Sequence, residues 1–114
     1  MQYSQILHDY FQHADHAGSL KGQNIIVRKH VSANPFDQFT LYLEVVDNTI
    51  KRANFEASST PALIAAGEYV CRWLENKSLI EAAGVQKAQI LQELNLDQRF
   101  IHVADLICRL LSEG

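Results

Sequence analysis

Cysteine is scarce in this 114-residue chain, which has only Cys71 and Cys108. Two cysteines this far apart exclude a disulfide framework and the close ligand pairs of a zinc-binding motif. The sequence contains no run of about 18 consecutive apolar residues, so we expect no membrane-spanning helix. The net charge is only −3 at neutral pH, which gives no electrostatic attraction to nucleic acid or to an anionic membrane.

Signatures of catalysis are absent as well. The sequence has no glycine-rich phosphate loop, no G-x-S-x-G nucleophile elbow and no H-E-x-x-H motif. Its first residues, MQYSQILHDYF, lack the basic start and continuous apolar run of a signal peptide. Apolar residues make up 47% and charged residues 20%, which is typical of a globular protein. We therefore expect a cytoplasmic protein that is not an enzyme, with one domain over residues 1–114.

The hydrophobic pattern predicts a helix, then a three-stranded meander, then several helices. Alternation with a period of two indicates the strands, and apolar spacings of three and four indicate the helices. Asp47 and Asn48 are expected to form the hairpin turn between the second and third strands, because both residue types tolerate positive φ. The expected elements are a helix over 3–13, strands over 24–31, 39–46 and 49–57, and helices over 61–76, 78–84, 85–94 and 97–111.

Such a sheet must cover its apolar face, and the helices are the available cover. We therefore predict an α+β fold, a two-layer sandwich in which helices cover a three-stranded antiparallel meander. Thr60 and Pro61 suit the N-cap and the first turn of the long helix. The hydroxyl groups of Ser58, Ser59 and Thr60 at this helix start are interpreted as caps rather than as an anion site.

Four segments of this chain are similar to one known family. They are YSQILHDYFQHADHAGSL, DQFTLYLEVVDNTIKRANFEA, ALIAAGEYVCRWLENKSLIEA and LQELNLDQRFIHVADLICRLL. Together they resemble the U-type scaffold proteins of iron–sulfur cluster assembly, the IscU and NifU N-terminal family. The resemblance implies an IscU/SufE-like sandwich and a function in iron–sulfur cluster assembly. It also implies a partner such as cysteine desulfurase or another assembly protein.

The resemblance implies a set of ligands from which this sequence departs. The family has cysteines at the positions occupied here by Pro35, Thr60 and Val103, and only Asp37 and His102 are retained among the implied ligands. A [2Fe–2S] cluster normally takes four protein ligands, mostly thiolates. Accepting sulfur from a desulfurase also needs a thiolate. We therefore expect a scaffold-like protein that does not hold a cluster in the family's usual way.

Three functions remain open from the sequence. The chain binds or modulates an assembly partner, or it holds zinc or iron weakly through Asp37, His102 and a third donor. Alternatively, the fold is reused as a protein–protein module in which Phe36 and Val103 form an apolar contact patch. The cofactor implied by the family is accordingly an iron–sulfur cluster or zinc. The structural alternative is that Asp37 caps a turn before a strand and that His102 caps or lines the final helix.

The cysteines are interpreted as core residues, and the N-terminal histidines as surface residues rather than as a metal-binding pair of His13 and His16. Cys71 and Cys108 lie on the apolar stripes of their predicted helices, where free cysteine commonly packs as a small hydrophobe. His8, His13 and His16 lie along or just after the first predicted helix. A surface position near a helix C-terminus is favoured for such residues by the helix dipole.

Overall fold

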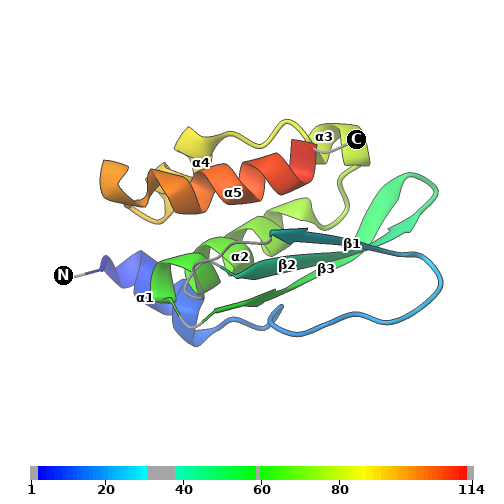
Figure 1. Cartoon of the computed structure of the whole chain (residues 1–114), viewed down its shortest axis with the longest axis horizontal. Coiled ribbons are helices and arrows are strands. Elements are labelled where there is room, and N and C mark those ends of the chain that lie inside the picture. Colours follow the sequence, from blue (N-terminus) through cyan, green and yellow to red (C-terminus); the bar gives the residue numbers. More distant parts are fainter. Residues whose placement is uncertain (1–2, 31–37, 59, 113–114) are drawn as a thin grey trace.

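The computed structural model describes residues 3–30, 38–58 and 60–112. Its strands form one antiparallel sheet in the order β1-β2-β3. Helices cover one face of this sheet, with α2 contacting β3 and α5 contacting β1 (Figure 1). The predicted α+β sandwich is therefore confirmed. The elements are α1 (Gln5–Gln12), β1 (Ile25–His30), β2 (Phe39–Val46), β3 (Thr49–Ala57), α2 (Pro61–Leu74), α3 (Leu79–Ala82), α4 (Lys87–Glu93), the 3₁₀ helix η2 (Gln98–Phe100) and α5 (Ile101–Ser112).

The hairpin between β2 and β3 follows from its turn residues. Asp47 and Asn48 have φ values of 53° and 61°, as the predicted turn requires. The two strands then pair from Val46 opposite Thr49 back to the start of β2, with one irregularity after Glu44. Side chains on the helix-facing side of this hairpin are buried, and they form one wall of the hydrophobic core: Phe39, Leu41, Leu43, Ile50, Ala53 and Phe55.

Helix ends follow their local sequence with one adjustment. Ser78 and Glu81 form a complete capping box at the start of α3, which explains why a helix of only four residues is stable there. The predicted last helix is instead divided into η2 and α5, and Asp97 caps η2 by accepting a hydrogen bond from the Arg99 amide. Among the described residues, no helix is long and apolar enough to span a membrane.

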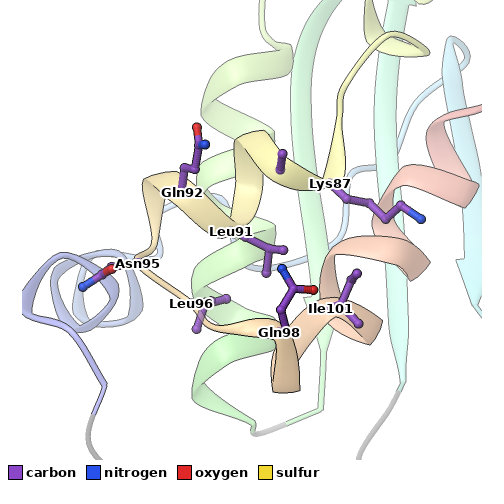
Figure 2. A pocket seen from close by; sticks show the side chains of 8 residues that line it. Lys87, Leu91, Gln92, Asn95, Leu96, Gln98 and Ile101 are labelled. Carbon is purple, nitrogen blue, oxygen red and sulfur yellow. The ribbon is translucent and has the colours of Figure 1, made fainter.

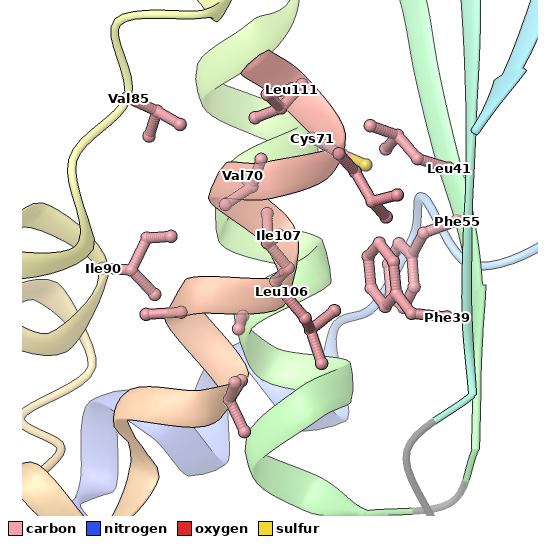
Figure 3. Packing of buried hydrophobic residues seen from close by; sticks show 14 of the residues in the cluster. Phe39, Leu41, Phe55, Val70, Cys71, Val85, Ile90, Leu106, Ile107 and Leu111 are labelled. Carbon is pink, nitrogen blue, oxygen red and sulfur yellow. The ribbon is translucent and has the colours of Figure 1, made fainter. Parts of the chain in front are cut away.

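Gly67 allows α2 to approach the sheet closely. Phe39 and Phe55 stack with ring centroids 5.8 Å apart and an interplanar angle of 8°, and Figure 3 shows the two rings projecting toward the helices. A Cβ atom on Gly67 would lie 2.8 Å from the ring of Phe55 and 3.0 Å from that of Phe39. The contact with Phe55 is shorter than real Cβ contacts and the contact with Phe39 is at their limit, so any larger residue here would force the rings to shift.

Replacing Gly67 with alanine is expected to lower the free energy of unfolding by about 2 kcal/mol, the usual cost of overpacking a core. The better helix propensity of alanine, about 1 kcal/mol, is too small to offset that strain. Urea unfolding followed by circular dichroism measures the loss. In a Phe55→Leu background, which removes the closer of the two rings, the same Gly67→Ala change should cost less. An equal cost in both backgrounds would contradict the proposed clash.

The outer edge of β3 is covered by two segments that are not strands. At one end, residues 13–18, here called the strap, run parallel to β3. The amide and carbonyl of Phe55 both bond to this strap, at N···O distances of 3.0 and 2.7 Å. At the other end, the amide and carbonyl of Ile50 bond to residues 76–77, each at 2.8 Å. These contacts protect an edge that would otherwise invite pairing with another strand.

Candidate functional site

The first residues of α2 and α5 lie at the same end of the molecule, where β2 begins (Figures 1 and 3). The ligand positions implied by the resemblance that the structure describes, Thr60, His102 and Val103, belong to these helix starts. Pro35 and Asp37 lie outside the described residues, as does Phe36. The chemistry available at this end is therefore judged from the two helices.

The start of α2 provides hydroxyl groups where the family has a thiolate. Thr60 occupies the N-cap position, but its side chain makes no capping hydrogen bond. Ser58 Oγ is buried and has no hydrogen-bond partner in the structure. The prediction that these hydroxyls cap the helix is thus wrong for Ser58 and Thr60, and Ser59 lies outside the described residues. The helix does begin at Pro61 as expected. Neutral hydroxyls are hard, weak donors that do not replace a thiolate on iron.

Val103 is a core residue at the start of α5. Its side chain is only 2% exposed, and it belongs to the main hydrophobic cluster. The hypothesis that Val103 forms an exposed apolar patch is therefore wrong, and Phe36 lies outside the described residues. A buried valine offers no electron pair to a metal or to sulfur, so Val103 itself cannot serve as a ligand.

His102 is exposed on the first turn of α5. Among the described residues, no group of three or more His, Cys, Asp or Glu side chains is arranged to hold a metal ion. The positive end of the α5 dipole also disfavours a cation beside His102. The weak site of Asp37 and His102 stays a prediction, because Asp37 lies outside the described residues.

The two cysteines do not compensate for the missing ligands. Cys71 is fully buried, and this burial, followed by the charges of Glu68 and Glu75, raises the pKa of its thiol well above the usual value. It also lies eleven positions after Thr60, about 16 Å along the helix axis. Cys108 is half-buried at the margin of the core, and its burial likewise raises its thiol pKa. The core interpretation is confirmed for Cys71, and neither residue provides a thiolate at neutral pH.

A shallow pocket of about 360 Å³ lies between α4 and the start of α5 (Figure 2). Its apolar surface comes from Leu91, Leu96 and Ile101, and amide side chains surround it. The ammonium of Lys87 at its edge is already paired with Asp105, at an N···O distance of 3.2 Å. The pocket thus offers contact surface but no nucleophile and no pair of acids. Its lining residues are Lys87, Ala88, Leu91, Gln92, Asn95, Leu96, Gln98 and Ile101.

A buried polar cluster joins the strap to α2. Glu68 is completely buried, and its Oε1 accepts a hydrogen bond of 2.8 Å from the His16 amide. Its Oε2 lies 2.6 Å from His16 Nδ1 and accepts a 2.7 Å bond from Arg72 Nε. His16 Nε2 in turn lies 3.0 Å from Glu75 Oε1. One imidazole ring is therefore held between two carboxylates, one within α2 and one at the C-cap that follows it.

The protonation of His16 follows from these contacts. Burial would lower the pKa of His16, but the hydrogen bonds to Glu75 and Glu68, together with their negative charges, raise it above its usual value. With its side chain only 20% exposed, His16 contradicts the predicted surface position. His13, in contrast, is exposed as expected. Its carbonyl accepts a 2.8 Å hydrogen bond from Arg72, whose guanidinium stacks 4.7 Å from the ring centroid of Tyr10.

Comparison with known proteins establishes the family. The family described as NifU-like N terminal domain matches residues 2–113. The chain belongs to this NifU-like family. The chain is also 29% identical over 116 aligned positions to the iron-sulfur cluster assembly scaffold protein IscU of Haemophilus influenzae, covering 99% of this chain and 88% of that protein. It is 28% identical to the IscU of Escherichia coli strain K12, covering 99% and 87%.

Solved structures share the fold of this NifU-like chain. A putative iron-sulfur cluster assembly scaffold protein of Fervidobacterium islandicum AW-1 superposes with a TM-score of 0.69 at 16% identity, covering 96% of this chain and 93% of that one. The N-terminal part of a nitrogen-fixing NifU-like protein from Brucella abortus gives a TM-score of 0.61 at 17% identity, covering 96% and 82%. At these identities the likeness shows the fold alone.

Sequence reasoning missed Glu68, the completely buried charged residue among those that the structure describes. Glu68 stands within the apolar stripe of α2, between Gly67 and Val70, where a charged residue needs a partner. Its spacing of four from Arg72 was a visible signal for one such partner. Nothing local pointed to His16, which is 52 positions away in the sequence.

Proposed function

We propose that this NifU-like chain functions in iron–sulfur cluster assembly by binding an assembly protein, without holding a cluster in the family's usual way. The family match over residues 2–113 supports the assembly context. The observation that carries the second part is Val103, which is buried where the resemblance implies a cysteine ligand. It is a non-enzymatic role, since the proposal needs contact with a partner and no chemical step in this chain.

The donor atoms at the starts of α2 and α5 support a role in which the chain binds a partner but does not hold a cluster. Thr60 offers only a hydroxyl, and the Val103 side chain offers no donor atom. Iron bridged by sulfide prefers soft anionic donors, which neither residue provides. The thiols of Cys71 and Cys108 have raised pKa values because of burial, so neither is a ready nucleophile for persulfide sulfur. A partner that delivers sulfur would thus meet a scaffold surface without its acceptor.

Cysteine desulfurase is the proposed partner, and a binding experiment tests it. The purified chain is titrated onto immobilised cysteine desulfurase, with Escherichia coli IscU as the positive control. We expect binding at micromolar concentration, and we expect the chain to compete with that IscU because both would use the surface common to the fold. Binding that survives saturating IscU would place the contact elsewhere on the chain. No binding at micromolar concentration would contradict the proposed partner.

A further inference from the structure

We propose that the strap is a latch that a proton on His16 holds closed, and that loss of this proton opens it and uncovers the outer edge of β3. The proposal concerns the conformation of the chain and does not depend on the function proposed above. It is based on the contacts of residues 13–18 with α2 and β3.

The strap is attached to α2 by polar contacts. His16 bonds to Glu68 through its amide and its ring, and to Glu75 through its second ring nitrogen. Arg72 donates a hydrogen bond to the carbonyl of His13. Apolar burial contributes little, since Ala14 is the strap residue that packs partly against the core, while His13, Asp15 and Ala17 are exposed. Closure of the strap therefore depends mainly on charge and hydrogen bonding.

The contacts of His16 require the protonated ring. Nδ1 and Nε2 each lie within hydrogen-bond distance of a carboxylate oxygen, and only the imidazolium form donates from both nitrogens. After loss of the proton, one ring nitrogen would direct its lone pair at Glu68 or Glu75. Glu68 has no access to water that would relieve this repulsion, because it is completely buried.

Other titratable groups near the ring do not reproduce this effect. On α2, the guanidinium of Arg72 binds Glu68, and Cys71 beside it stays a neutral thiol because burial raises its pKa. On α1, Tyr10 stacks on Arg72. On β3, the strap contacts the backbone amide and carbonyl of Phe55, which are uncharged. The two carboxylates facing His16 are thus the groups that make strap closure proton-dependent.

The direction of the pH effect follows from linkage. The pKa of His16 is raised in the closed state above its ordinary value of 6.5. The contribution of this proton is therefore complete below pH 6.5 and is lost as pH rises through the raised pKa. Between those limits, the equilibrium constant for opening should rise by up to about tenfold per pH unit and then level off.

Opening would change the surface beside α2. The amide and carbonyl of Phe55 would lose their partners in the strap, which leaves part of β3 available for pairing with another strand. A shallow groove already follows this junction. The groove is lined by Ala17, Gly18, Phe55, Glu56, Ala57 and Ile64.

Hydrogen exchange provides a direct test. The amides of Gly18 and Phe55 each donate across the junction between the strap and β3, so their exchange reports opening. Exchange is measured by NMR from about pH 5.5 to about pH 9 and corrected for its intrinsic pH dependence. We expect both amides to lose protection together by up to about tenfold per pH unit above pH 6.5, while amides between β2 and β3 keep theirs. Equal corrected protection at both ends of this range would overturn the proposal.

Three variants distinguish proton-dependent opening of the strap from a general loss of stability. His16→Gln, which is uncharged at every pH, should remove the pH dependence of the Gly18 and Phe55 amides. Glu75→Gln should keep the strap closed at low pH but reduce the total rise, because it removes one cause of the raised His16 pKa. His8→Gln changes an exposed histidine on α1 and should retain the wild-type profile. A wild-type profile in both His16→Gln and Glu75→Gln would show that His16 is not the controlling group.

Discussion

The free energy of unfolding should fall by about 3 kcal/mol when Glu68 is replaced with alanine, because breaking one side of a buried ion pair leaves its partners uncompensated. Glu68 is the one charged side chain that is completely buried among the described residues, and it accepts three hydrogen bonds or close polar contacts from His16 and Arg72. Urea unfolding at neutral pH measures the change. The loss should also free the strap, so the Gly18 amide should exchange faster.

Glu44→Ala is the matched control for this substitution. Glu44 pairs with Arg52 through two short hydrogen bonds, yet the pair lies on the solvent side of the sheet. Exposed pairs of this kind contribute little, so we expect a much smaller loss than for Glu68→Ala. Similar losses in the two variants would show that burial of Glu68 does not give its contacts special weight.

Restoring the implied cysteines should restore cluster binding. In the variant Pro35→Cys, Thr60→Cys, Val103→Cys, three thiols join Asp37 and His102 at the positions that the resemblance assigns to ligands. Val103→Cys nearly conserves volume, so the core should tolerate it. Position 60 lies at the N-terminus of α2, where the helix dipole lowers the pKa of a thiol and favours the thiolate. Anaerobic reconstitution should then give a stable visible absorbance with bound iron and sulfide.

The control for this gain is the double variant Pro35→Cys, Thr60→Cys, which keeps Val103. It lacks one soft donor and should bind clearly less iron and sulfide than the triple variant. Circular dichroism shows whether each variant is folded. A folded triple variant without iron or sulfide would mean that these positions do not correspond to the family's ligands in this chain.

The fold was predicted well because strand alternation, turn residues and helix caps depend on residues that are close together in the sequence. Strand alternation gave β2 and β3, Asp47 and Asn48 gave the turn, and Ser78 gave the start of α3. In the last helix, Val103 shares the buried side with Ala104, Ile107 and Leu111, as their apolar spacing favours. The predicted contact patch at Val103 is wrong because this apolar spacing buries the side chain in the core.

The polar cluster was beyond local reasoning. The interaction of His16 with Glu68 depends on how the segment after α1 crosses α2, and their separation of 52 residues leaves no periodic signal. Predicting a surface position from the helix dipole was wrong for His16 because tertiary contacts with two carboxylates outweigh that weaker effect. The predicted pair of Asp37 and His102 stays untested for a different reason, namely that Asp37 lies outside the described residues.

The central claim is that this NifU-like chain does not hold an iron–sulfur cluster through the family's usual ligands. Its most direct test is the iron and sulfide content of the wild-type chain after anaerobic reconstitution, with an absorbance spectrum and with Escherichia coli IscU treated in parallel. We expect the wild-type chain to retain iron and sulfide only at the level of a protein-free blank, and to show no stable visible absorbance. Stoichiometric iron and sulfide with a lasting visible spectrum would contradict the claim.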